Sequence, residues 1–401
     1  MSNPFRSDAF IDAARVRRVS IVILVASLAG LVALLAYSDG MRDYKGRPLG
    51  ADFSNVYAAG RMAQEGAAPL VYDWPAHHAE QQRVFDDPEI EFYGWHYPPF
   101  FLLAAALLAF LPYTASWLVW MAATLPLYLA SIRAIIPEKG ALLAAAAFPA
   151  VFVNFIHGQN GFLTAALIGA AMLVLNRRPL VAGVLIGLLA YKPQFGVLIP
   201  IALIAAGRWR SFAAAAATVL MLIAVSTLAF GPDVWRAFAE SGHLTRTVVL
   251  ENGNTGWEKI QSLFSALRAF GAPVGAAYAA QGALFAGIAT SLVWLWRSTA
   301  PQNLKAAGLI VGSLLATPYA LDYDLMALGP AIAFLAALGL REGFRPYEKT
   351  LLAVAFFAPV AARPVATATL IPLGLIIMLA LYACILRRAR ATARAGSPAP
   401  T

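Results

Sequence analysis

The sequence predicts an all-α polytopic membrane protein, because it is poor in charge and contains several long apolar runs. Of its 401 residues, 60% are hydrophobic and only 13% are charged, whereas soluble domains carry about 25% charged residues. A helix needs about 20 apolar residues to cross hydrocarbon, and a transmembrane β-barrel would instead show alternating segments of about ten. Four uncharged runs approach or exceed the helical length: Val19–Tyr37, Ser211–Phe230, Pro273–Trp296 and Val365–Leu386.

The net charge of +9 is concentrated beside the first and last spans. Basic flanks of this kind are typical of cytoplasmic segments, so we expect both termini in the cytoplasm and no nucleic-acid partner. The arginines concerned are Arg15, Arg17, Arg18, Arg387, Arg388, Arg390 and Arg394. The single cysteine, Cys384, excludes an intrachain disulfide and a thiolate metal cluster.

Hydropathy divides the chain into seven predicted segments with about 12–13 transmembrane or partial helices. The segments are a cytoplasmic N-terminus (1–18), a first transmembrane helix (19–37), a periplasmic loop with short helices (38–97), transmembrane helices and polar-tipped hairpins (98–230), a periplasmic loop with an interfacial helix (231–272), C-terminal transmembrane helices (273–386) and a basic cytoplasmic tail (387–401). After the loop, the predicted helices cover 98–111, 114–136, 141–156, 161–176, 179–191, 194–206, 211–230, 275–296, 305–318, 325–340, 348–362 and 365–386.

The loop 38–97 is expected outside the cytoplasm and folded. It holds ten acidic and five basic residues, which is typical of an external loop. Asp52 opens a predicted helix over 54–65, and Pro75 marks the start of a second that continues over 77–85. The loop is therefore predicted to form two short helices on the membrane surface.

The basic loops between later spans leave one ambiguity in the topology. Strict alternation from the acidic loop places Lys139, Arg177–Arg178 and Arg208–Arg210 outside, whereas counting back from the C-terminus places them inside. The conflict disappears if one segment between 98 and 136 does not cross, and the sequence does not identify which.

Counting from the C-terminus, three hairpins place polar sequences at their outer ends. The tips are His157-Gly158-Gln159-Asn160-Gly161, Tyr191-Lys192-Pro193-Gln194 and Thr317-Pro318-Tyr319-Ala320-Leu321-Asp322-Tyr323-Asp324. A fourth outer segment, 231–258, is polar and rich in Gly and Asn, and 259–270 reads as an amphipathic interfacial helix. Polar chemistry thus collects on the face that also carries the acidic loop.

Asp52 and Lys192 each have two readings from sequence. Asp52 is either a helix N-cap that accepts backbone N–H bonds or a general base at the membrane surface. Lys192 either extends its charge to the interface or holds an anion in a polar cavity, since charges at depth in membranes are costly and tend to be functional. Pro193 frees backbone groups that only protein or water can satisfy.

The remaining polar candidates also have structural alternatives. His96 and Tyr97 mark an aromatic belt and a helix start, while His157 is either a phosphate donor or an interfacial histidine. Asp322 and Asp324 are suitable ligands for a divalent cation, but two carboxylates are too few to claim a site. The sequence has no phosphate-binding loop and no hydrolase motif, so energy must come from a gradient or an activated membrane substrate.

An ordered series of short motifs extends from about residue 51 to 325. It comprises Asp52-Phe53, Tyr57-Ala58-Ala59-Gly60-Arg61, Tyr72-Asp73, Tyr97-Pro98-Pro99, His157-Gly158-Gln159-Asn160, Ala190-Tyr191-Lys192-Pro193-Gln194, Thr317-Pro318-Tyr319 and Asp322-Tyr323-Asp324. In order and spacing the series resembles bacterial glycosyltransferase family 87. The resemblance implies a bundle of the GT-C class that uses polyprenyl-phosphate sugars on the external face of the bacterial inner membrane.

The resemblance further implies a mannosyltransferase-like enzyme, or a relative that uses another hexose or pentose, with Asp52 as the catalytic base and a lipid or glycan acceptor. A phosphate leaving group needs cations and hydrogen-bond donors, for which the candidates are Lys192, Arg61, His96 and His157. Single displacement with inversion needs no second carboxylate nucleophile. Other candidate site residues are Tyr97, Gln159, Asn160, Gln194, Tyr319, Asp322 and Asp324, with no metal ligand assigned.

Two other classes of function fit part of the pattern. A secondary transporter or flippase of a lipid-linked or small anionic substrate also uses proline-broken helices and intramembrane polar residues. Against it, the chain shows no two-fold repeat and devotes sixty residues to an acidic first loop. A non-catalytic scaffold leaves Lys192 and the external polar cluster unexplained.

Overall fold

The computed structural model describes residues 10–395, and within them it is all-helical, with isolated β-bridges and no strand. The predicted all-α membrane fold is confirmed. Within residues 10–395, six helices are long and apolar enough to cross a membrane, or seven if the bent pair α6–α7 forms one span. Residues 1–9 of the predicted N-terminus and 396–401 of the predicted tail lie outside the described residues.

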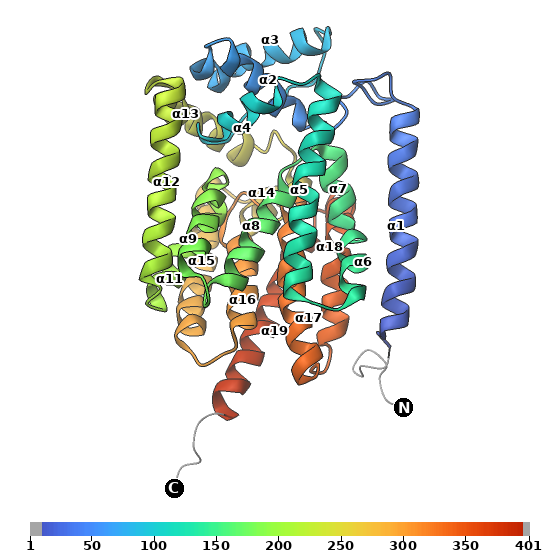
Figure 1. Cartoon of the computed structure of the whole chain (residues 1–401), viewed down its shortest axis with the longest axis vertical. Helices are drawn as coiled ribbons and strands as arrows, with labels where there is room; N and C mark the ends of the chain where they lie inside the picture. Colours follow the sequence, from blue (N-terminus) through green and yellow to red (C-terminus); the bar gives the residue numbers. More distant parts are fainter. Residues whose placement is uncertain (1–9, 396–401) are drawn as a thin grey trace.

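Figure 1 labels most of the α-helices. Their bounds are α1 Ala13–Ala36, α2 Phe53–Gln64, η1 Ala68–Tyr72, α3 Trp74–Phe85, α4 Phe101–Leu108, α5 Tyr113–Ile135, α6 Lys139–Ala146, α7 Pro149–His157, α8 Gly161–Val174, α9 Pro179–Leu188, η2 Leu189–Tyr191, α10 Pro193–Gly196, α11 Leu198–Ala205, α12 Trp209–Phe230, α13 Asp233–Leu244, η3 Thr245–Glu251, η4 Trp257–Lys259, α14 Leu263–Ala269, α15 Val274–Arg297, α16 Gln302–Ala316, η5 Asp322–Ala327, α17 Leu328–Glu342, α18 Glu348–Thr369 and α19 Leu373–Ala395.

The short helix α4 resolves the topological ambiguity. Its eight residues span about 12 Å, far less than the ~30 Å of a hydrocarbon core. It packs instead against α2, and Figure 1 places it beside α2 and α3 at the upper end of the bundle. The segment 98–111 is therefore the one that does not cross, and the 23-residue α5 is the span that follows it.

The outer cap, which we define as residues 38–97, contains helices α2 and α3 close to where the sequence predicts them. Asp73 caps α3 by accepting the Ala76 backbone N–H at 2.9 Å, with Pro75 in the first turn. Most of α2 is buried, from Phe53 through Gly60, and the helix packs against α4 and α3. Figure 1 shows both helices lying across the end of the bundle.

Several inner helices are too short to cross hydrocarbon on their own. Helix α8 has 14 residues, or about 21 Å, and α16 has 15. Figure 1 shows that the α8–α9 and α10–α11 segments stop below the outer cap. Their ends are the polar tips that the sequence predicts, so polar residues lie inside an apolar bundle.

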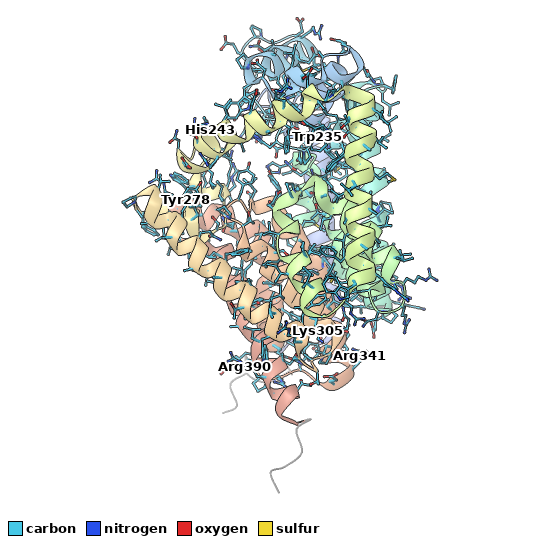
Figure 2. The ribbon with its side chains drawn as sticks, turned by 90° about the vertical axis from the view of Figure 1, so that its left-hand side faces the viewer. Trp235, His243, Tyr278, Lys305, Arg341 and Arg390 are labelled. Carbon is cyan, nitrogen blue, oxygen red and sulfur yellow. The ribbon has the colours of Figure 1, made fainter. Side chains whose placement is uncertain are left out.

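The segment 231–258 differs from the predicted loop because most of it is helical. Helix α13 continues into the π-helical turn η3, and Figure 2 shows α13 crossing the upper part of the molecule between α12 and the region of α15. The predicted interfacial helix 259–270 is shortened to α14, whose Phe264, Ser265 and Ala266 are buried against α15. Helix α14 therefore packs against another helix, where the prediction had it lying on the membrane surface.

The last two helices divide at a different point from the one predicted. Pro359 and Pro364 lie inside α18, which continues to Thr369, and the break comes at residues 370–372. Helix α19 continues past the predicted span end at Leu386. Figure 2 shows Lys305, Arg341 and Arg390 toward the lower end of the molecule. The described ends of α1 and α19 lie at this same end (Figure 1).

Candidate functional site

The outer cap meets the α7–α8 tip at Asp52. The Asp52 backbone N–H donates to the His157 carbonyl at 3.0 Å, and Gln159 Nε2 donates to Asp52 Oδ2 at 2.6 Å. Gln159 is buried, whereas Asp52 is only half-buried. The carboxylate is therefore held from one side by an amide and remains partly accessible.

Two glycines permit this close approach of the backbones. Gly50 and Gly158 have φ values of +65° and +64°, a conformation that costs other residues energy. A Cβ on Gly158 would lie 2.5 Å from the Cβ of Phe53, and one on Gly50 would lie 2.6 Å from Nε1 of Trp117. Larger side chains at either position would push Asp52 away from the tip.

Asn154 fixes the α7–α8 tip. Its Nδ2 donates to the Gln159 carbonyl at 2.9 Å, and its Oδ1 accepts the Gly161 N–H at 2.8 Å. The residue is fully buried, so both hydrogen bonds are shielded from water. This positioning residue is absent from the predicted site, although an Asn three residues before His157 in an apolar helix is a visible signal.

Asp52 occupies the N-cap position of α2 but makes no side-chain capping bond. This distinguishes it from Asp73 and Ser262, whose side chains do cap their helices. The capping interpretation of Asp52 therefore lacks its defining hydrogen bond. Its carboxylate is directed to Gln159 instead.

The second and third tips are joined by an ion pair between Lys192 Nζ and Asp324 Oδ1, 2.5 Å apart. Their side chains are only 3% and 1% exposed. The second Asp324 oxygen accepts the Leu321 N–H at 3.1 Å, and the rings of Tyr323 and Phe195 lie 5.2 and 5.9 Å from the ammonium. Neither sequence interpretation of Lys192, interfacial charge or anion holder, includes this structural ion pair.

Asp322 lies beside the first tip and next to a cation, Arg363, that is absent from the predicted site. Its Oδ1 accepts the Tyr323 N–H at 2.8 Å, and its Oδ2 lies 3.8 Å from Nη1 of Arg363 on α18. The segment η5 packs against α7 and α8, and α18 packs against both η5 and α7. Arg363 was overlooked because it lies between two predicted spans.

Two further predicted residues, His157 and Tyr97, belong to this region. His157 Nδ1 donates to the Val153 carbonyl at 2.8 Å, so its Nε2 is the ring nitrogen left for a ligand. The Tyr97 hydroxyl donates to Gln159 Oε1 at 3.4 Å. Burial, followed by the charge of Asp52, raises the pKa of Tyr97 well above its usual value, so the phenol remains a hydrogen-bond donor.

Asn160, Gln194 and Tyr319 lie on the tips themselves. The Asn160 carbonyl accepts the hydroxyl of Tyr191 at 3.2 Å, while its buried Oδ1 has no hydrogen-bond partner within the described residues. Half-buried Gln194 lies in α10, and the Tyr319 N–H donates to Thr317 Oγ1 at 3.0 Å. These residues shape the tips, and the orphaned Asn160 oxygen is free to accept a hydrogen bond from a ligand.

Arg61 and His96 lie in the outer cap and do not supply free cations. Arg61 donates to Glu80 at 3.0 Å and to Glu65 at 3.3 Å, about 13 Å along the helix from Asp52. His96 Nδ1 bonds Thr245 Oγ1 at 2.9 Å, and burial lowers the pKa of His96 to about 4. The imidazole is therefore neutral at pH 7, so a role for His96 as a fixed positive charge is not supported.

The carboxylates do not assemble a metal site within the described residues. No group of three or more His, Cys, Asp or Glu side chains there is placed to hold an ion. Asp324 is committed to Lys192 and Leu321, and Asp322 to Tyr323 and Arg363. The arrangement is therefore one of hydrogen bonds and ion pairs around a single accessible carboxylate.

Comparison with known families identifies a matching family model. A family model described as glycosyltransferase family 87 matches residues 95–318, which is more than half of the chain and includes all of the first two tips and the start of the third. Asp52 lies before the matched residues. No curated protein and no solved structure matches the chain.

Replacing Lys192 alone with Met should destabilise the protein by about 3–5 kcal/mol, because it leaves Asp324 charged, buried and unpaired. The double variant Lys192→Met/Asp324→Leu should recover much of this loss. Melting temperatures of the purified single and double variants check the expectation. Additive losses in the double variant would contradict a direct pair.

A second expectation concerns His77, which is fully buried in the outer cap with neither ring nitrogen hydrogen-bonded within the described residues. Burial, with smaller effects of His96 and His78, lowers the pKa of His77 to about 3. The unfolded histidine, with a pKa near 6.5, takes up a proton first, so stability falls as pH falls. Between pH 7 and pH 5 His77 should contribute a loss of about 2 kcal/mol.

His77→Phe should reduce this pH dependence of the melting temperature. His243→Phe, at an exposed position, is the matched control and should retain it. Equal pH dependence in the two variants would show that His77 is not responsible.

Proposed function

The chain belongs to glycosyltransferase family 87, a family of membrane glycosyltransferases, and we propose that it transfers a sugar from a polyprenyl-phosphate donor to a lipid or glycan acceptor. Mannose is the sugar we propose. The multi-pass fold supports a donor that reaches the site from within the bilayer. We place the protein in the bacterial inner membrane with the outer cap in the periplasm.

The observation that carries the proposal is the state of Asp52. It is a half-buried carboxylate that caps no helix and is held by Gln159 at the meeting point of cap and hairpin tip. A base in this position removes the proton of the acceptor hydroxyl. Of the three nearby carboxylates, Asp322 and Asp324 are buried and ion-paired, which favours Asp52 for this role.

The proposed reaction is a single displacement with inversion. The acceptor oxygen forms a bond to the anomeric carbon as its proton passes to Asp52. The bond between that carbon and the phosphate oxygen breaks, and its electron pair leaves on the polyprenyl phosphate. One base and one anionic leaving group suffice, and no glycosyl-enzyme intermediate is needed.

Of the four residues predicted to bind the donor phosphate, only one still fits that role. His157 remains a candidate because Nε2 is its unbonded ring nitrogen. Lys192 acts by holding the second and third tips together, and Arg61 and His96 serve the outer cap. Family membership favours the enzyme over the transporter alternative.

Asp52→Asn should lower transfer about 10²–10⁴-fold, because a neutral amide has negligible basicity. Its melting temperature should stay near that of the wild type. Asp73→Asn is the matched control, since Asp73 is a true N-cap; it should cost at most about 1 kcal/mol of stability and keep activity.

The assay incubates purified protein with radiolabelled polyprenyl-phosphate mannose and cellular lipid extract. Near wild-type turnover in Asp52→Asn would remove Asp52 from the mechanism. Absence of protein-dependent label transfer with mannose, and with other polyprenyl-phosphate sugars, would contradict the proposed donor class.

The orientation of the outer cap is tested by cysteine labelling in a Cys384→Ala background. Tyr44→Cys, at an exposed cap position, should react with an impermeant thiol reagent in cells whose inner membrane is intact. Arg341→Cys, at the opposite end of the bundle (Figure 2), should react only after that membrane is broken. The reverse pattern would overturn the periplasmic placement of Asp52.

A further inference from the structure

We propose that Arg363 binds the phosphate of the donor lipid and that Asp322 is the positioning residue that aims it. The inference rests on the proposed function, because it names the cation that a polyprenyl-phosphate donor requires. Neither the resemblance nor the family match covers Arg363, which lies beyond residue 318.

Arg363 lies where a lipid headgroup can reach it from the side. It is six residues before the end of α18 at Thr369, or about 9 Å along the axis. On one side of it are the buried positions Pro359 and Ala362, and on the other are the exposed Val360 and Pro364. The side chain thus stands at the border between the packed face and the lipid-facing face of the helix.

The guanidinium retains most of its hydrogen-bonding capacity. Its ion pair with Asp322 is 3.8 Å long, which exceeds hydrogen-bond distance, and the arginine carries five N–H donors. The Arg363 side chain is 39% exposed, while Asp322 is 6% exposed. A buried carboxylate therefore orients the cation without occupying its donors.

Lys192, the cation expected from sequence, is in the opposite state. Its ammonium is buried at 2.5 Å from Asp324, so taking up a phosphate would require breaking that pair. Arg268 is likewise committed, to the carbonyls of Glu251 and Ala272. Arg363, by contrast, is accessible, makes only a weak contact with Asp322 and lies beside the tips.

The charges around the site also favour a role for this cation. Lys192 and Asp324 cancel, which leaves the carboxyl groups of Asp52 and Asp322 and the positive charge of Arg363. Without Arg363 the site would present only negative charge to an anionic donor. During transfer the phosphodiester becomes a phosphomonoester and gains negative charge, which a bidentate guanidinium stabilises.

The test measures binding of a short-chain polyprenyl phosphate and of the matching uncharged prenol to purified protein in detergent. Arg363→Gln should weaken binding of the phosphate about 10- to 100-fold, the range of charge-assisted hydrogen bonds, and leave binding of the prenol unchanged. Arg363→Lys should recover part of the affinity. Asp322→Asn should weaken phosphate binding less than Arg363→Gln does, because the guanidinium remains.

Two control variants separate this site from general charge effects. Arg387→Gln removes an exposed arginine far along α19. Lys259→Gln removes a cation next to Ile260, whose backbone forms a β-bridge with Leu321 of the third tip. Both should bind the phosphate like the wild type, and all variants should keep the wild-type melting temperature. If Arg363→Gln does not fold, Arg363→Lys tests the proposal in its place. Lysine keeps the charge but lacks the planar guanidinium, so its affinity for the phosphate should be lower than that of the wild type.

The outcomes also separate this inference from the proposed function. Unchanged phosphate affinity in Arg363→Gln and Arg363→Lys, with transfer activity present in the wild type, would overturn the role of Arg363 alone. An equal loss in Lys259→Gln would also overturn it, because the effect would not be specific to Arg363. If the wild type neither binds the phosphate nor transfers sugar, both the inference and the proposed donor fail.

Discussion

The buried ion pair between Lys192 and Asp324 is the interaction on which the arrangement of the hairpin tips depends. Two charges in an apolar bundle are tolerated only when they neutralise each other and satisfy their remaining hydrogen-bonding capacity. Asp324 does both, since its second oxygen accepts the Leu321 N–H. The pair therefore fixes the third tip against the second. Because Asp322 is only two residues from Asp324, the same pair also fixes the position of Asp322.

A second constraint is that every helix broken within an apolar bundle exposes backbone groups that need partners. At the first tip Asn154 supplies them, and the Tyr191 hydroxyl of the second tip bonds the Asn160 carbonyl and Thr164 Oγ1. At the third, the N–H of Gln261 donates to the Ala320 carbonyl. These hydrogen bonds satisfy the backbone groups of the tips without using Asp52 or Arg363. The two residues therefore remain as accessible charges of opposite sign near the tips.

Local sequence signals predicted the helices and the tips, but not the partners between distant segments. Apolar runs and the Asp73-Trp74-Pro75 start gave correct helices because these signals act within one turn or one span. The partner of Lys192 lies 132 residues away, so no local pattern could reveal the pair. Arg363 falls between the predicted helices 348–362 and 365–386, whereas α18 continues through it and packs against α7 and η5.

The same sequence separation has a consequence for biosynthesis. At about 5–20 residues per second, Lys192 is made roughly 7–26 s before its partner Asp324. During that interval an ammonium without a counter-ion is too costly to leave in hydrocarbon, so the hairpin that carries it has to wait near an aqueous surface. The site can therefore close only after most of the chain has been inserted, and a chain truncated before Asp324 contains Asp52, Gln159 and Lys192 without the pair that brings the tips together.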